Sequence, residues 1–201
     1  MKKHWMAVVF TLAVSTLLVG CAGKMKYPSY YTLNVPLAPD PPAAENIRTS
    51  VAVREFRSPV YLRQGPIVYR PTPEQIGFYE YHRWAVDPRV LVTNTVVDRL
   101  RASGNYAQVK PYDGHSDTDY VLSGHLEKLE EIDYDGGIKV EVAISAQMTR
   151  LATGETVWSN DASEVGIVAQ RNVPAVVAEM NRTMERTIDK LLTPVPAAIA
   201  K

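Results

Sequence analysis

The chain has 201 residues, and its 22 Lys and Arg balance 22 Asp and Glu, so its formal net charge is zero. Lys2 and Lys3 lie in the first twenty residues, where no acid occurs, so the rest of the chain carries 20 of the 22 basic residues against all 22 acids. Nucleic-acid-binding domains normally carry a basic excess, so this balance disfavours a nucleic-acid partner. The single cysteine excludes an intrachain disulfide.

The first twenty residues have the layout of an export signal. Two lysines precede an apolar run over residues 5–19, which is shorter than the roughly 20 residues that span a bilayer. The run ends in Leu-Val-Gly-Cys at positions 18–21, which resembles the lipobox of bacterial lipoproteins. We therefore expect cleavage before Cys21 and attachment of a diacylglycerol and an N-acyl chain to it. The alternative is a buried free cysteine behind an uncleaved anchor.

An acylated Cys21 would hold the protein on a membrane, because each buried methylene contributes about 0.8 kcal/mol and stable anchoring takes more than one chain. Residues 1–20 are then the signal peptide and residues 21–29 an acylated tether. Ala22 stands where an aspartate commonly retains enterobacterial lipoproteins in the inner membrane. The resemblance to the lipobox therefore favours the periplasmic face of the outer membrane.

The mature chain begins with short strands separated by proline-rich segments. Proline lacks an amide donor and restrains the residue before it, so residues 34–48 are predicted to be a loop. Alternating apolar residues and turn signals predict strands at 30–33, 51–56, 67–70 and 75–81.

Two helices are predicted from apolar residues at helical spacing. The first runs from Pro88 to about Ser103, with Gly104 as its C-terminal cap, and buries Val90, Thr93, Val96, Val97 and Leu100. The second runs from about Val173 to Leu192, with Asn172 as N-cap and Pro174 in its first turn. Its apolar stripe is Val173, Val177, Met180, Met184, Ile188 and Leu191.

Between the helices, alternating runs predict a short strand at 106–110 and a three-stranded meander at 120–132, 138–151 and 156–163. The apolar phase shifts between Leu126 and Leu129, which predicts a bulge near Glu127. These elements predict an α/β fold: a single mixed-sheet layered domain over residues 30–193, with about seven strands and two long helices. Residues 194–201 are predicted to be a disordered tail.

Residues 61–84 concentrate aromatic and arginine side chains. Such side chains bury large areas while keeping a polar tip, as interaction surfaces require. Two interpretations stay open, a core on short strands and a partner-binding surface, and for Trp84 the core is the stronger of the two. The candidate partner-binding residues are Tyr69, Arg70, Tyr79, Tyr81, Arg83 and Trp84.

The strong enzyme signatures are absent: no Walker loop, Gly-x-Gly-x-x-Gly, Gly-x-Ser-x-Gly or His-Glu-x-x-His occurs. The oxygen-rich stretch around Asp117 and Asp119 lacks the features of a calcium loop, so we expect a solvated turn. Glu130 and Glu131 are neighbours on a strand and point to opposite faces, so they are not an acid/base pair. We expect a surface hydrogen bond for His125. No catalytic residue, metal or cofactor is expected, apart from the acyl chains on Cys21.

Several segments together resemble the ABC-type transport auxiliary lipoprotein family, to which PqiC belongs. They are the lipobox, Tyr31-Thr32-Leu33, Ile67-Val68-Tyr69-Arg70, Tyr81-His82-Arg83-Trp84-Ala85, the strand from Asp119 to Leu126, and Trp158. The most specific is the Tyr-x-x-Trp-Ala segment; the Val86-Asp87-Pro88 that follows departs from the family, which commonly has an acidic residue and prolines there.

The resemblance implies a non-enzymatic periplasmic component anchored in the outer membrane. It would work with an MCE-type substrate-binding protein and an inner-membrane permease in lipid or hydrophobic-solute transport. The resemblance leaves open whether the protein forms a homo-oligomer. The alternative is a periplasmic lipoprotein whose own domain binds a lipid or another small hydrophobic ligand, which would need an apolar cavity. A periplasmic hydrolase is disfavoured by the missing nucleophile and metal motifs.

Overall fold

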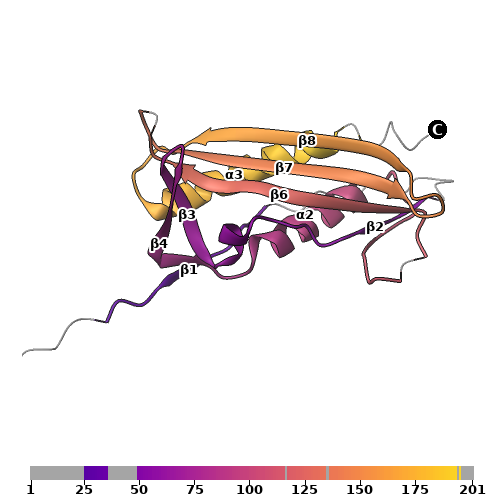
Figure 1. The fold of residues 1–201 in the computed structure, drawn as a ribbon, viewed down its shortest axis with the longest axis horizontal. Coiled ribbons are helices and arrows are strands. Elements are labelled where there is room, and N and C mark those ends of the chain that lie inside the picture. Colours follow the sequence, from indigo (N-terminus) through magenta and orange to yellow (C-terminus); the bar gives the residue numbers. More distant parts are fainter. Residues whose placement is uncertain (1–24, 36–48, 116, 135, 194, 196–201) are drawn as a thin grey trace, which may run out of the picture.

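Eight strands and two long helices make up the part of the chain that the computed structural model describes, residues 25–35, 49–115, 117–134, 136–193 and 195 (Figure 1). This confirms the predicted mixed-sheet α/β fold. The elements are β1 (Ser29–Tyr31), β2 (Ser50–Val53), a 3-10 turn η1 (Val60–Arg63), β3 (Pro66–Thr72), β4 (Gln75–Trp84), α2 (Pro88–Ala102), β5 (Gln108–Pro111), β6 (Tyr120–Ile132), β7 (Lys139–Arg150), β8 (Thr156–Ile167) and α3 (Val173–Leu192).

The long strand β6 organises the sheet. On one side it pairs antiparallel with β7 from end to end. On the other side it pairs in parallel with β2 near its start and with β3 near its end. Beyond these neighbours, β5 pairs with β2, while β4 and then β1 continue from β3. The β1–β4–β3 group and the β2–β5 pair therefore lie toward opposite ends of the β6–β7–β8 meander (Figure 1).

The meander has the predicted bulge. The register between β6 and β7 shifts between Leu126 and Lys128. Leu129 lies three positions after Leu126, an odd offset that would put them on opposite faces of a regular strand. The bulge turns both inward, so each is fully buried. Strand β8 continues four residues beyond the predicted end at residue 163, because Ile167 still pairs with Lys139 of β7.

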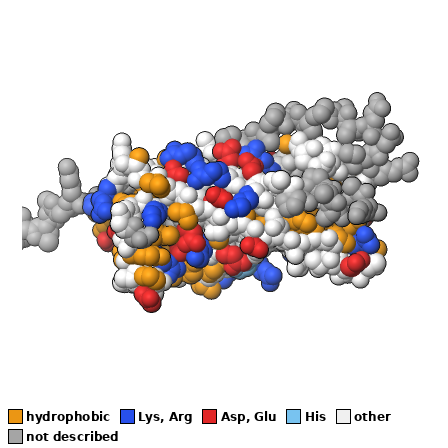
Figure 2. All heavy atoms as spheres, turned by 90° about the horizontal axis from the view of Figure 1, so that it is seen from above, with side chains coloured by type: hydrophobic (Ala, Val, Ile, Leu, Met, Phe, Trp, Pro, Cys, Tyr) orange, Lys and Arg blue, Asp and Glu red, His pale blue; other side chains and the backbone are white. Residues whose placement is uncertain are grey.

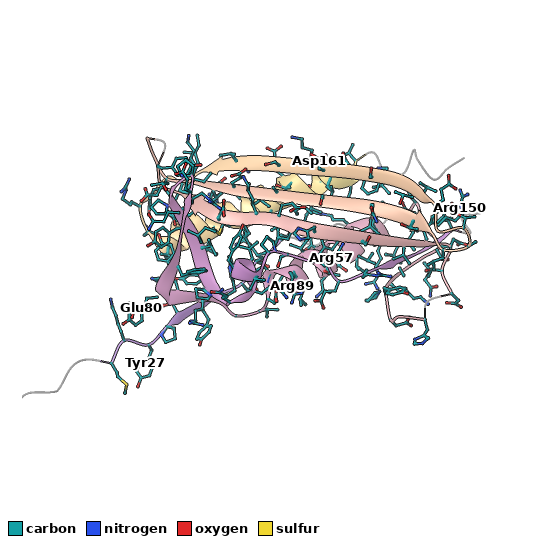
Figure 3. All side chains as sticks on the ribbon, viewed as in Figure 1. Tyr27, Arg57, Glu80, Arg89, Arg150 and Asp161 are labelled. Carbon is teal, nitrogen blue, oxygen red and sulfur yellow. The ribbon has the colours of Figure 1, made fainter. Side chains whose placement is uncertain are left out.

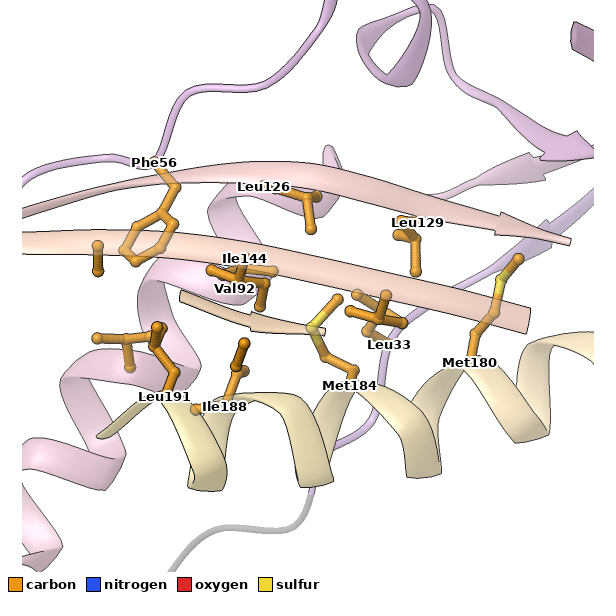
Figure 4. Close-up of a cluster of buried hydrophobic side chains, with 14 of the residues drawn as sticks. Leu33, Phe56, Val92, Leu126, Leu129, Ile144, Met180, Met184, Ile188 and Leu191 are labelled. Atoms are coloured by element: carbon orange, nitrogen blue, oxygen red, sulfur yellow. The ribbon is translucent and has the colours of Figure 1, made fainter. Parts of the chain in front are cut away.

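Helix α3 covers one face of the meander with the predicted apolar stripe. Asn172 caps the helix: its side chain accepts a hydrogen bond of 2.9 Å from the Ala175 amide. All six predicted stripe residues are buried. In Figure 4 four side chains of this helix point toward the residues of the sheet that they cover: Met180, Met184, Ile188 and Leu191.

Helix α2 begins and ends as the sequence predicts, with one change in its buried face. Asp87 caps it by accepting from the Arg89 amide at 2.9 Å, and Gly104 follows the helix with a φ of 66°. Val92 is buried in place of Val90, which is half-buried. Val92 lies four residues before Val96, so it extends the same face by one turn toward the helix start.

Several sequence predictions fall outside the described residues. These are the signal peptide, Cys21 and the start of the tether, most of the predicted loop 34–48, and the predicted tail apart from Val195. Val195 is 1% exposed and belongs to the hydrophobic core.

Candidate interaction surface

The six candidate partner-binding residues lie on the β3–β4 hairpin, whose outer strand β4 also carries β1 in parallel. Strand β4 runs to Trp84, three residues beyond its predicted end, because Ser29–Tyr31 pairs with its last residues. The structure divides the six residues into an internal group of four and an outer group of two.

Arg70 is held by a buried carboxylate. Its guanidinium makes two hydrogen bonds to Glu130, from Nε to Oε1 at 2.8 Å and from Nη2 to Oε2 at 3.0 Å. The third nitrogen, Nη1, donates to the Pro73 carbonyl at 2.8 Å. The side chains of Arg70 and Glu130 are 17% and 0% exposed. The hydrogen bond to Glu130 raises the pKa of Arg70. Arg70 therefore ties the hairpin to β6 and has little left to offer a partner.

Tyr69 and Tyr79 form a second internal contact. The Tyr79 hydroxyl donates a hydrogen bond of 2.8 Å to Glu131 Oε2, and the centroids of the Tyr79 and Tyr69 rings lie 5.0 Å apart. The Tyr69 ring covers Gly77, where a Cβ would come within 2.3 Å of Tyr69 Cζ. Any side chain at position 77 would therefore have to displace the Tyr69 ring. Glu130 and Glu131 have separate partners, as expected for strand neighbours that point to opposite faces.

Burial of Glu131 gives a pH-dependent prediction. Burial is the largest cause that raises the pKa of Glu131; Asp133 adds to it, and the Tyr79 hydrogen bond and Arg171 oppose it. The unfolded chain therefore releases this proton at a lower pH than the folded one, so ionisation of Glu131 costs stability as the pH rises above about 4.3. We expect Glu131→Gln to stabilise the protein at pH 7 by on the order of 1 kcal/mol, with no gain below the unfolded pKa.

Urea unfolding at several pH values measures this difference. The exposed Glu74, at the tip of the same hairpin, provides the matched control Glu74→Gln, which should show no such pH-dependent gain. A Glu131→Gln gain that is as large at pH 3 as at pH 7 would contradict a charge-based cause.

Trp84 belongs to the core. It is 5% exposed and packs in the main hydrophobic cluster, while its amide donates to the Gly65 carbonyl at 2.8 Å. The core interpretation of Trp84 therefore holds, and this residue is withdrawn from the candidate surface. Its position on β4 faces inward together with its register partner Tyr31.

Tyr81 and Arg83 are half-buried and lie on the outer side of β4. Arg83 lies opposite Tyr30 in the β1–β4 register. Lys26 Nζ lies 5.0 Å from the centroid of the Tyr81 ring, a cation–π contact. The outer surface of the hairpin thus continues into the N-terminal segment.

Sequence reasoning missed the most exposed apolar residues in this region. Met25, Tyr27 and Tyr30 are 77%, 76% and 63% exposed. The sequence signal was available, because these residues stand among lysines in a segment with no acid between Cys21 and Asp40. The prediction of residues 21–29 as a tether assigns these side chains no contact of their own.

A polar hollow of about 390 Å³ lies on the sheet face opposite α3. His125 Nδ1 lies 2.9 Å from Glu127 Oε2, close enough for an ion pair when the imidazole is protonated, but Nδ1 makes no hydrogen bond there, so the predicted surface hydrogen bond is not formed. Ser145 Oγ donates to the same Glu127, to Oε1 at 2.7 Å, and so is not paired with the imidazole. The hollow is lined by Arg57, Ser123, Gly124, His125, Ser145, Ala146, Gln147, Ser159, Asn160 and Asp161.

A second hollow, of about 350 Å³, is lined by Thr49, Thr118, Asp119, Tyr120, Arg150 and Ala152. Neither hollow has the apolar lining that a buried acyl chain would require. Asp119 accepts from Ser50 and Asp117 pairs with Lys110, so both carboxylates of the predicted turn have protein partners. Within the described ranges, no group of three or more His, Cys, Asp and Glu is placed to hold a metal ion.

The part of the chain that the structure describes forms one mixed-sheet α/β domain of eight strands and two long helices. The family model described as "ABC-type transport auxiliary lipoprotein component" matches residues 31–191, and the chain belongs to this family. The resemblance seen in the sequence is therefore confirmed. No curated protein sequence matches the chain significantly.

Solved structures share the fold at low sequence identity. Protein XCC0632 from Xanthomonas campestris is similar with a TM-score of 0.72 at 18% identity, over 85% of this chain and 96% of that one. An uncharacterized protein has a TM-score of 0.66 at 15% identity, over 84% of this chain and 99% of its own. A PelC dodecamer from Paraburkholderia phytofirmans has a TM-score of 0.50 at 19% identity, over 75% of this chain and 89% of the PelC chain. None of the helices in the described ranges is long and apolar enough to cross a membrane.

Proposed function

We propose that this protein is the lipid-anchored component of an MCE-type, PqiC-like intermembrane transport system and docks the transport assembly at the periplasmic face of the outer membrane. The observation that carries the proposal is the family match over residues 31–191 in a chain whose Leu-Val-Gly-Cys sequence ends at Cys21. The transported solute is a lipid or another hydrophobic compound, and the domain itself is not an enzyme.

The length of the tether limits how far the domain can lie from the membrane. Seven residues lie between Cys21 and Ser29, where β1 begins, so the extended tether reaches roughly 30 Å at most. An acylated Cys21 therefore keeps the whole domain beside the bilayer. The partner is an MCE-type periplasmic protein that spans toward the inner-membrane permease.

Co-purification from cells tests the proposal. A C-terminally tagged chain, solubilised in detergent from outer-membrane fractions, should recover an MCE protein, and deletion of the gene should raise sensitivity to membrane-perturbing compounds. Cys21→Ser is the matched control: it should fold normally yet be lost from the outer-membrane fraction. Normal expression with neither an MCE protein nor a sensitivity phenotype would reject the proposed role.

Self-assembly is a separate question within this proposal. The PelC protein with a similar fold forms a dodecamer. A homo-oligomer of this chain stays a prediction, and mass measurement of the acylated protein in detergent would decide it.

A further inference from the structure

The tether-side edge of the sheet carries a cluster of aromatic and basic side chains that are exposed or half-buried. Strand β1 is an edge strand, because in the described sheet it pairs only with β4. On its outer side Tyr30 lies beside Arg83, and Tyr81 lies two residues earlier on the same face of β4. Lys26 covers the Tyr81 ring, and its chain neighbours Met25 and Tyr27 are largely exposed. We call this cluster the tether patch: Met25, Lys26, Tyr27, Tyr30, Tyr81 and Arg83.

The patch combines the side chains that favour a membrane surface. Tyrosine places an apolar ring among lipid headgroups while its hydroxyl stays in water, and lysine and arginine extend their charged ends toward phosphates. The chain from Cys21 to Pro39 contains lysines and no acid, so its charge complements anionic headgroups. Glu80 is the acid that contacts the patch, through the hydroxyl of Tyr81.

Chain length decides which surface the patch meets. Met25 is four residues from Cys21, which limits its distance from the lipid attachment point to roughly 14 Å. The headgroup layer on each side of a bilayer is itself about 5–8 Å thick. The N-terminal segment leaves the molecule at the β1–β4 corner, and Tyr27 lies there, away from the far end marked by Arg150 (Figure 3). In Figure 2 the end from which this segment leaves carries apolar and basic side chains, with acidic ones among them.

We propose that the tether patch rests on the phospholipid headgroups around the acyl anchor and so fixes the orientation of the domain on the membrane. This inference rests on the proposed acylation of Cys21. It assigns Tyr81 and Arg83 to the lipid surface, so the transport partner docks elsewhere on the domain. The β7–β8 turn at the opposite end of the meander then points away from the bilayer.

Fluorescence quenching by brominated lipids tests this orientation. Acylation blocks the thiol of Cys21, the only native cysteine, so one introduced cysteine carries the label. Tyr30→Cys places it on the patch, and Leu151→Cys places it in the β7–β8 turn, where the native side chain is 40% exposed. The acylated full-length variants are inserted into vesicles of phosphatidylethanolamine and phosphatidylglycerol brominated near the headgroups. We expect quenching at position 30 to be several-fold stronger than at position 151.

Further substitutions establish the cause. In the Tyr30→Cys background, Lys26→Glu with Tyr27→Ser and Tyr81→Ser should reduce quenching to the level at position 151. Arg57→Glu, an exposed change on the polar sheet face, should leave quenching unchanged.

The outcomes separate the two proposals. Protein that floats with the vesicles but shows equal, weak quenching at both positions overturns the tether patch and leaves the anchor intact. Protein that does not float overturns the anchor and this inference with it. Self-quenching at position 30 that grows with protein density, without quenching by bromine, would show that a second copy covers the patch and would also overturn the inference.

Discussion

Replacing Arg70 with methionine is expected to lower the free energy of unfolding by about 3–5 kcal/mol. The substitution keeps much of the apolar volume but leaves the fully buried carboxylate of Glu130 without its two hydrogen bonds. An unpaired buried charge costs far more than an exposed ion pair contributes. With an m-value of about 2 kcal/mol/M, the urea midpoint should fall by roughly 1.5–2.5 M.

Two controls isolate the cause of that loss. Arg57→Met removes an exposed arginine and should change stability by less than about 0.5 kcal/mol. Glu130→Leu introduced together with Arg70→Met removes the stranded charge and should restore much of the stability. A double variant no more stable than Arg70→Met alone would show that packing of the arginine, and not the buried charge, accounts for the effect.

Trp84→Ala is expected to destabilise the protein by about 3–5 kcal/mol, because it removes a large side chain that is 5% exposed and leaves a cavity in the core. Tyr81→Ala, three residues away on the outer face, should cost within about 1 kcal/mol, since it removes mainly the contact with Lys26. Chemical unfolding monitored by circular dichroism measures both variants.

The comparison of Trp84 with Tyr81 also tests the division of the aromatic cluster. Trp84→Phe keeps an aromatic ring at the core position and should recover part of the lost stability. Equal destabilisation by Trp84→Ala and Tyr81→Ala would contradict the assignment of one residue to the core and the other to the surface.

Local patterns predicted the elements that one packed face defines. The alternation in β7 and the apolar stripe of α3 are determined by a single buried side, so period two and period 3.6 were enough to place them. The phase change between Leu126 and Leu129 predicted the bulge for the same reason. Strand ends were less certain: β4 and β8 both continue past their predicted ends because pairing with β1 and β7 supplies hydrogen bonds that no local pattern encodes.

The candidate surface was predicted less well, for a physical reason. Aromatic and arginine side chains suit both cores and interfaces, so composition located the cluster without dividing it. The division came from contacts between segments far apart in the chain: Arg70 with Glu130, and Tyr79 with Glu131.

By itself, the sequence determined the class of protein, the mixed α/β fold, most helix and strand positions and the prediction of a lipid anchor at Cys21, because periodicity, caps and the processing motif are local. The tertiary structure alone decided that Trp84 is core and that Arg70 neutralises a buried acid. It also brought the N-terminal Tyr30 beside Arg83, because parallel pairing of β1 with β4 joins segments more than fifty residues apart.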